Sequence, residues 1–390
     1  MSLVVKTRWW YLLLPVMTYM MVACSSSSSK NAVKPEALPD TRQFVTTKKR
    51  WTRTVGSGLG KYYQTITPAL DEEYIYAADR NGRVKALDRK KGTTAWSTNI
   101  KASISGGVGS GGDLVLVGTV DGELVALDRL KGEPLWRAEV SSEILSPPQT
   151  NGSVVVVQTS DGKLFGFSAT DGKQLWLYSV ALPVLTLRGT AAPIITGNTV
   201  VAGFANGKVV ALAARSGSFL WEQRIARPTG RTELERIIDI NGSPALANDI
   251  VFVTSYQGRL VAMSRANGRI LWSKESSSYQ GPVVINGRVY VVGQDSHLYA
   301  YEAATGRVLW ENKQLLNRQL SPPQGVSGFL AVSDYQGYLH IIDPEAGVIL
   351  GRTRIDSEGV RSPMATDGTY LYVLGNDGRL ASVAVHLLRP

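Results

Sequence analysis

Cysteine and histidine are scarce in this chain, and charged residues are few. The 390 residues include one Cys and three His, and only 19% are Asp, Glu, Lys or Arg. A single Cys excludes an internal disulfide framework and any zinc site built on several thiolates. The three His lack the His-Glu-x-x-His spacing of zinc proteases. With 44% hydrophobic residues, the chain has enough apolar material for a large core, which excludes a disordered tail protein.

Motifs that hold nucleotides or support catalysis are also lacking. Gly107-x-Gly109-x-x-Gly112 has the letters of a dinucleotide fingerprint, but it precedes an expected strand instead of opening a helix. Gly60-Lys61 lacks the first Gly and the Ser or Thr of a phosphate loop. The net charge is +10, yet the basic residues are scattered through expected turns without stacking aromatics. We therefore expect no catalytic residue, no metal, no cofactor and no nucleic-acid partner.

The amino terminus has the pattern of a targeting segment. Lys6 and Arg8 precede an apolar stretch, residues 9–22, which is as long as a signal-peptide core and short for a membrane span. Residues 21–24, Met-Val-Ala-Cys, resemble a bacterial lipobox with Met in place of the usual Leu. This pattern predicts that residues 1–23 are a lipoprotein signal peptide and that Cys24 is lipidated. A plain secretory signal with an incidental Cys is the alternative.

The residues after Cys24 indicate a tether to the outer membrane. Ser25 stands where an Asp would favour retention at the inner membrane, so we expect the periplasmic face of the outer membrane. Ser-rich and Pro-containing residues 24–43 are typical of a flexible tether. Removal of the signal deletes two cations and no acid, which lowers the net charge from +10 to +8.

A fixed spacing of 14 residues recurs seven times in the rest of the chain. In each repeat, a Trp follows a turn residue after 14 positions; in the seventh repeat a Gly takes the place of the Trp. Another Gly lies four residues before each Trp, and before the Gly that replaces it. The turn residues are Gly82, Gly122, Gly162, Gly207, Gly258, Ser296 and Gly337, and the later positions are Trp96, Trp136, Trp176, Trp221, Trp272, Trp310 and Gly351. Short β-branched runs and Asn-Gly or Asp-Gly turns flank these positions and predict hairpins.

Each repeat predicts four strands, because a Pro marks an inner strand before the hairpin and the Trp opens an outer strand. A four-stranded unit of about 40 residues is a propeller blade. The eighth unit would place its Trp beyond Pro390, whereas Trp51 precedes the first unit. We therefore predict an all-β fold, a single eight-bladed β-propeller over residues 44–390, whose ring is closed by the N-terminal strand. The Trp residues would be wedges between blades.

Two consecutive connections between blades are unusually long. The distance from Trp176 to Pro193 is 17 residues and that from Trp221 to Pro244 is 23, against 10 to 13 elsewhere. Such connections leave the blades on one face, so the two should form one patch, and loops on a rigid scaffold often carry binding sites. In the first, Leu185 and Leu187 alternate with a Thr. They are either ordinary strand residues tucked into a blade or an apolar anchor rimmed by the charged residues 231–239.

The chain as a whole resembles the BamB family, the lipoprotein subunits of the outer-membrane β-barrel assembly (BAM) complex, within the larger group of quinoprotein-like (PQQ-type) propeller repeats. The motifs that carry this resemblance lie outside the repeat. They are the lipobox, Val55–Gly60, Tyr76–Asp79, Leu185–Gly189 with Ala192-Pro193, and Thr229–Arg236 running into Asp239.

This resemblance implies a non-enzymatic scaffold that binds the periplasmic POTRA repeats of the BamA subunit and supports the folding and insertion of outer-membrane proteins. Unfolded outer-membrane proteins are further candidate partners. The residues that match the BamA-contacting positions of the family are Leu185, Leu187, Arg188, Asp239 and Asn241. Asn241 replaces the family's second Asp, which keeps an acceptor and loses a charge. The resemblance favours the anchor interpretation of the Leu-x-Leu-Arg loop.

Two other functions are compatible with a propeller of this kind. Quinone-dependent dehydrogenases use the same repeat, but they are larger, and many carry a vicinal Cys pair with calcium-binding acids. This chain has one Cys, which the lipobox uses. A generic periplasmic binding propeller that attaches to the cell wall is the second alternative.

Overall fold

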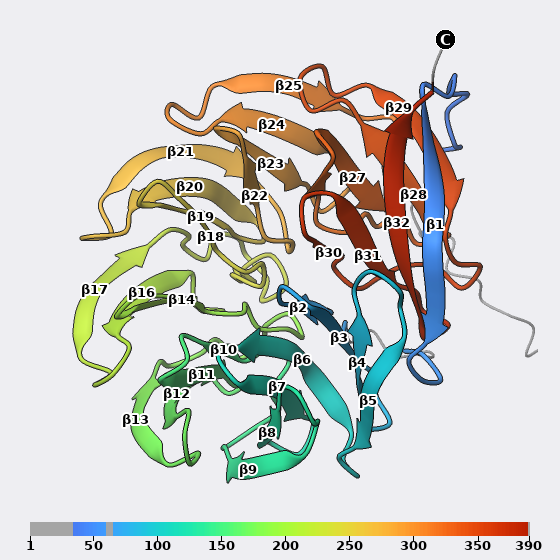
Figure 1. The fold of residues 1–390 in the computed structure, drawn as a ribbon. Coiled ribbons are helices and arrows are strands. Elements are labelled where there is room, and N and C mark those ends of the chain that lie inside the picture. Colours follow the sequence, from blue (N-terminus) through green and yellow to red (C-terminus); the bar gives the residue numbers. More distant parts are fainter. Residues whose placement is uncertain (1–33, 60–64, 389–390) are drawn as a thin grey trace, which may run out of the picture. The chain divides into compact units, whose positions relative to one another are not determined.

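The computed structural model describes residues 34–59 and 65–388, and residues from Pro35 onward belong to one compact unit. The expected signal peptide and Cys24 lie outside the described residues. Eight four-stranded antiparallel sheets follow one another around a ring (Figure 1). The prediction of an all-β, eight-bladed propeller is therefore confirmed. Among the described residues, none belongs to a helix that could span a bilayer.

Seven blades each consist of four consecutive strands, ordered from the axis to the rim. They are β2 (Ala69–Leu70), β3 (Tyr74–Ala78), β4 (Arg83–Asp88) and β5 (Thr94–Asn99) in blade one; β6 (Ile104–Gly111), β7 (Leu114–Thr119), β8 (Glu123–Asp128) and β9 (Pro134–Glu139) in blade two; β10 (Gln149–Thr150), β11 (Val154–Gln158), β12 (Lys163–Ser168) and β13 (Gln174–Ser179) in blade three; β14 (Ile194–Thr196), β15 (Thr199–Gly203), β16 (Lys208–Ala213) and β17 (Phe219–Arg224) in blade four; β18 (Ala245–Ala247), β19 (Ile250–Thr254), β20 (Gly258–Ser264) and β21 (Ile270–Ser276) in blade five; β22 (Val283–Ile285), β23 (Arg288–Val292), β24 (Leu298–Glu302) and β25 (Val308–Asn312) in blade six; and β26 (Gln324–Val326), β27 (Phe329–Ser333), β28 (Tyr338–Ile342) and β29 (Ile349–Arg354) in blade seven.

The eighth blade joins the two ends of the ring. It consists of β30 (Ala365–Thr366), β31 (Tyr370–Leu374), β32 (Arg379–Leu387) and, as the outer strand, β1 (Val45–Thr54). β1 pairs antiparallel with β32 over its length, with Trp51 opposite Ser382 (Figure 1). The predicted closure by the N-terminal strand is confirmed, and Trp51 occupies the position that the repeat leaves empty at the C-terminus.

The repeated Trp and Gly residues meet between neighbouring blades. Each Trp indole N–H donates to a backbone carbonyl of the next blade at 2.7–3.1 Å, as in the bond from Trp176 to Ala214. The Trp ring also packs on the repeated Gly of the next blade, the one that lies four residues before that blade's own Trp position. A Cβ added to this Gly would come within 2.4–2.6 Å of the ring. These Gly residues, such as Gly217, also have φ near +70°, so other residues would be strained there. The Trp residues are wedges, as predicted.

The hydrophobic core consists of eight clusters, one at each interface between adjacent blades. The cluster that closes the ring joins Trp51 and Val55 to Tyr372 of blade eight and to Ile75 of blade one. Each interface buries aliphatic side chains from both of its blades. The core is therefore distributed around the ring, which leaves the connections between blades free to vary in length.

The N-terminal segment replaces the Trp that blade seven lacks. A Cβ on Gly351 would lie 2.7 Å from the amide oxygen of Gln43 and 2.8 Å from a methyl of Val45. Upstream, residues 35–43, here called the strap, run along blades six and seven. The strap is held by Arg318, which donates to the carbonyl of Glu36 at 2.9 Å, and by Arg352, which donates to the carbonyl of Pro39 at 2.7 Å. The last part of the expected tether thus lies on the ring.

Candidate functional site

The two long connections lie side by side. They span residues 180–193, between β13 and β14, and residues 225–244, between β17 and β18. The backbone N–H of Leu187 donates to the Asp239 carboxylate at 3.0 Å, and the N–H of Ala192 donates to the Ser243 hydroxyl at 3.0 Å. The expected single patch is therefore confirmed, and we call the two connections the docking loops.

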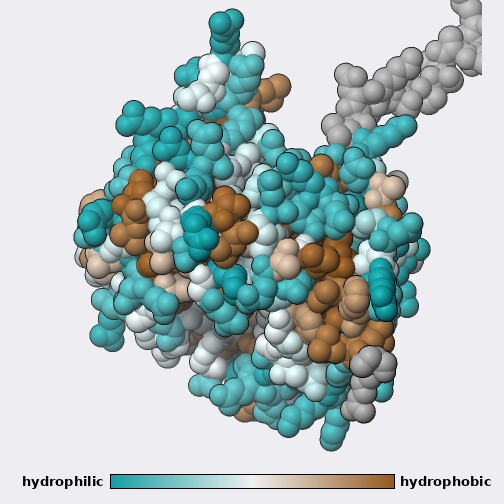
Figure 2. Space-filling model, turned by 90° about the horizontal axis from the view of Figure 1, so that it is seen from above, coloured by the Kyte–Doolittle hydropathy of each residue, from teal (hydrophilic) through white to brown (hydrophobic). Residues whose placement is uncertain are grey.

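The Leu-x-Leu-Arg segment is an exposed loop and not a strand. No strand is assigned between Ser179 and Ile194, so the interpretation of ordinary strand residues is wrong. Leu185 is 41% exposed and the neighbouring Val184 is 93% exposed, whereas Leu187 is partly buried. On the face drawn in Figure 2, exposed apolar side chains form separate patches among hydrophilic ones. The large apolar residues that are exposed in the docking loops are Val184, Leu185 and Leu234.

Arg188 is turned toward a third connection. Its guanidinium contacts both carboxylate oxygens of Glu143, at 3.0 and 3.2 Å, while most of the Arg188 side chain stays exposed. Glu143 lies between β9 and β10, in a connection of ordinary length. This exposed ion pair is worth little on its own, on the order of 0–1 kcal/mol, so a partner's carboxylate could replace Glu143 at low cost.

Asp239 faces inward and fixes the loop above it. Asp239 is 1% exposed, and its backbone carbonyl accepts a hydrogen bond from the N–H of Tyr256 at 2.7 Å. Burial raises the pKa of the Asp239 carboxyl to about 7, although hydrogen bonds from the N–H groups of Leu187 and Ile240 oppose the rise. The carboxylate therefore positions Leu187 and Arg188 and does not itself reach solvent.

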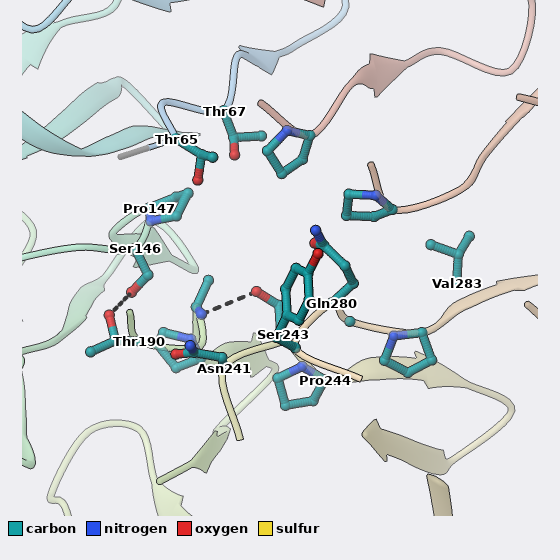
Figure 3. A pocket seen from close by; sticks show the side chains of 18 of the residues that line it. Thr65, Thr67, Ser146, Pro147, Thr190, Asn241, Ser243, Pro244, Gln280 and Val283 are labelled. Carbon is teal, nitrogen blue, oxygen red and sulfur yellow. Dashed lines mark hydrogen bonds between the residues drawn. The ribbon is translucent and has the colours of Figure 1, made fainter. Parts of the chain in front are cut away.

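Asn241 lies beneath the first docking loop, at the wall of the central cavity. Its amide oxygen is buried without a hydrogen-bond partner, and a Cβ on Gly189 would approach it to 2.7 Å. The cavity has a volume of about 550 Å³ and is lined by hydroxyl, amide and proline side chains from several blades (Figure 3). Beside Asn241, Thr190 donates to the Ser146 hydroxyl at 3.1 Å. The sequence-predicted residues thus form an outer layer, Leu185 to Arg188, in which Leu187 is partly buried, over an inner layer, Asp239 and Asn241.

The pH dependence of stability reports on Asp239. Because its folded-state pKa lies above the ordinary value of 3.8, the folded protein holds this proton more tightly than the unfolded chain does. Its contribution is most favourable below the ordinary pKa and is lost as the pH rises through about 7. The difference in unfolding free energy between the native and Asp239→Asn chains should thus change by at most about 4 kcal/mol between about pH 4 and pH 8. Urea unfolding of both chains across this pH range measures the difference. If the two chains showed the same dependence of unfolding free energy on pH, the raised pKa of Asp239 would be contradicted.

The chain matches the family model described as outer membrane protein assembly factor BamB, over residues 31–98 and 80–312. It is 46% identical to the outer membrane protein assembly factor BamB of Pseudomonas aeruginosa, over 97% of this chain and 99% of that protein. The crystal structure of BamB from Moraxella catarrhalis matches with a TM-score of 0.80 and 28% identity, covering 87% of this chain and all of that one.

Quinoprotein enzymes share the architecture at much lower identity. The quinohemoprotein alcohol dehydrogenase of Comamonas testosteroni matches with a TM-score of 0.67 and 13% identity, over 87% of this chain and 76% of that one, which shows a common fold alone. The identity to that enzyme, 13%, lies far below the 46% identity to the relative from Pseudomonas aeruginosa. With a family-model match over most of its length and relatives of up to 46% identity among those compared, the chain belongs to the BamB family of outer-membrane protein assembly factors.

Proposed function

We propose that the protein is a non-enzymatic scaffold of the BAM complex that binds the POTRA repeats of BamA through the docking loops. The observation that carries this proposal is the contact between the loops: the buried Asp239 holds the backbone of Leu187, so that Leu185 and Arg188 are presented to solvent. A preformed loop loses less conformational entropy when it binds than a disordered one does. The names of the relatives support membership of the complex, and the loop geometry supports the surface.

The chemistry of the surface suits a protein partner. Enclosing Leu185 or Leu187 against apolar side chains would contribute about 1–3 kcal/mol each. Arg188 can exchange Glu143 for a carboxylate of the partner and bind it with two parallel hydrogen bonds. POTRA repeats present exposed sheet edges, so addition of a strand to such an edge can contribute as well.

Attachment to the outer membrane is part of the proposal. Lipidation of Cys24 would hold the ring at the periplasmic face, close to a membrane-bound partner, and several acyl chains on one residue anchor a protein stably. A dehydrogenase activity has weaker support, because the similarity to the quinoprotein enzymes is limited to the fold. Unfolded outer-membrane proteins remain candidate partners of the assembled complex.

Capture of BamA from detergent-solubilised membranes tests the docking loops. We expect the Leu187→Ala, Arg188→Ala double variant to capture BamA at least about tenfold less tightly, because it removes an apolar contact and a paired cation. The control is the Leu271→Ala, Arg269→Ala variant, which truncates the same two residue types on the exposed outer edge of blade five, outside the docking loops. Undiminished capture by the first variant, or an equal loss in both, would contradict the assignment.

A further inference from the structure

The outer strand of the closing blade has an unusual charge pattern. β1 carries four cations, Lys48, Lys49, Arg50 and Arg53, and no acid. Lys48, Lys49 and Arg53 are exposed. β29, the outer strand of blade seven, contacts β1 and adds Arg352 and Arg354 (Figure 1). We call these six residues the basic rim.

The cations of the basic rim are not neutralised by carboxylates. In the described part of the chain, none of the six forms an ion pair. Where their side chains donate hydrogen bonds, the acceptors are backbone carbonyls: Lys49 donates to Ile355 at 3.0 Å, and Arg50 to Lys90 at 3.1 Å. Carbonyl acceptors orient a cation and leave its net charge in place, so the rim keeps its positive charge, apart from Arg50, which lines a pocket with Glu72, Glu73 and Asp88.

Protection of an open sheet edge does not explain this pattern. Cations on an edge strand discourage pairing with another chain, but the outer strands of the other blades face the same hazard. β5 and β13 contain no Lys or Arg. β9, β17 and β21 each carry one cation and one acid, and β25 carries an acid alone. The excess of positive charge is therefore specific to the rim of blades seven and eight.

The chain also reaches the ring at the basic rim, where the strap leads into β1 after the expected membrane anchor at Cys24. The strap enters at Glu36, whose N–H donates to Leu316 in the connection between blades six and seven. It then passes along β29 into β1. Glu36 lies twelve positions after Cys24, which limits the distance between the two residues to at most about 43 Å. A lipid on Cys24 would therefore keep these two blades nearer the bilayer than the opposite side of the ring.

We propose that the basic rim is a membrane-contact surface that binds the anionic headgroups of phospholipids in the leaflet that holds the lipid anchor. The orientation, though not the charge, rests on the proposed lipidation of Cys24. Each Lys or Arg near an anionic bilayer contributes attraction that is additive and screened by salt. The docking loops, which connect blades three to five, are not part of the basic rim. The ring can therefore bind its protein partner while the rim contacts the membrane.

Vesicle sedimentation tests the proposal with a chain of residues 25–390, which retains every described residue of the ring. The vesicles contain phosphatidylcholine, alone or with roughly a third of phosphatidylglycerol. The test variant is Lys48→Gln, Lys49→Gln, Arg53→Gln. The matched control, Lys131→Gln, Arg215→Gln, Arg269→Gln, removes the same charge from exposed turns of blades two, four and five.

The native chain should bind the anionic vesicles at about 0.05 M salt and be released at about 1 M. The test variant should lose roughly a hundredfold in partitioning, and the control a few-fold at most. An equal loss in both variants would show that vesicle binding depends on the net charge of the protein and not on the rim, which would overturn the proposal. Absence of vesicle binding by the native chain would overturn it as well. Capture of BamA by the test variant should be unchanged, which separates this surface from the docking loops.

Discussion

Replacing Trp51 with Ala should lower the free energy of unfolding by about 3–5 kcal/mol, as expected for removal of a buried Trp. Trp51 is 7% exposed, and its ring lies on Gly92 of blade one and near Tyr372, at a centroid separation of 6.0 Å. Its indole N–H donates to the carbonyl of Arg89 at 3.1 Å. The substitution therefore leaves a cavity and an unpaired carbonyl at the interface where the two ends of the ring meet.

Urea unfolding of the Trp51→Ala chain measures this loss, with Leu130→Ala as the control. Leu130 is 57% exposed, so its truncation should change the free energy of unfolding by less than about 0.5 kcal/mol. Trp96→Ala removes the same wedge within the continuous part of the ring. If both Trp variants lose equal stability but only Trp51→Ala opens β1 to proteolysis, the closing role of this strand is supported. A loss below about 1 kcal/mol for Trp51→Ala would contradict it.

The blade architecture could be predicted because it depends on local spacing. A turn Gly with positive φ and a Trp ring that needs that Gly leave a periodic trace in the sequence, as at Gly217 and Trp176. Closure could also be predicted, since Trp51 supplied the missing position. Gly351 marked blade seven as different, but its neighbours Gln43 and Val45 could not be identified, because contacts across some 300 residues leave no periodic trace.

The docking loops could be located from the sequence, but their inner contacts could not. Loop lengths predicted one patch, and the contact between Leu187 and Asp239 confirms it. The sequence placed Asp239 in the charged rim of residues 231–239, whereas in the structure it is buried beneath the backbone of the first docking loop. The pairing of Glu143 with Arg188 could not be predicted, because Glu143 lies in a connection between blades of ordinary length. The strap was missed for a related reason: Arg318 and Arg352 hold it by backbone carbonyls, which every residue possesses.

Replacing Asp334 with Ala should lower the free energy of unfolding by about 3–5 kcal/mol, because it leaves a buried cation without its partner. The side chains of Asp334 and Arg318 are 0% and 3% exposed. The carboxylate accepts from Arg318 Nε at 2.8 Å and from His340 at 3.1 Å, and Arg318 Nη2 lies 2.7 Å from it. Burial alone would raise the pKa of Asp334, but the hydrogen bonds from His340, the Tyr338 backbone and Arg318 hold it below its ordinary value. The carboxylate is therefore charged at neutral pH.

The same cluster secures the strap, so the loss should be visible at two places. Arg318 also donates to the carbonyl of Glu36, and a guanidinium released from Asp334 would no longer be fixed for that bond. Asp334→Ala should therefore speed hydrogen exchange at the Glu36 N–H as well as lower stability. Asp171→Ala is the control, since its partner Lys173 is 82% exposed and such surface pairs contribute little to stability. Equal losses in the two variants would mean that the buried cluster is no stronger than a surface ion pair, and unchanged exchange at Glu36 would separate the cluster from the strap.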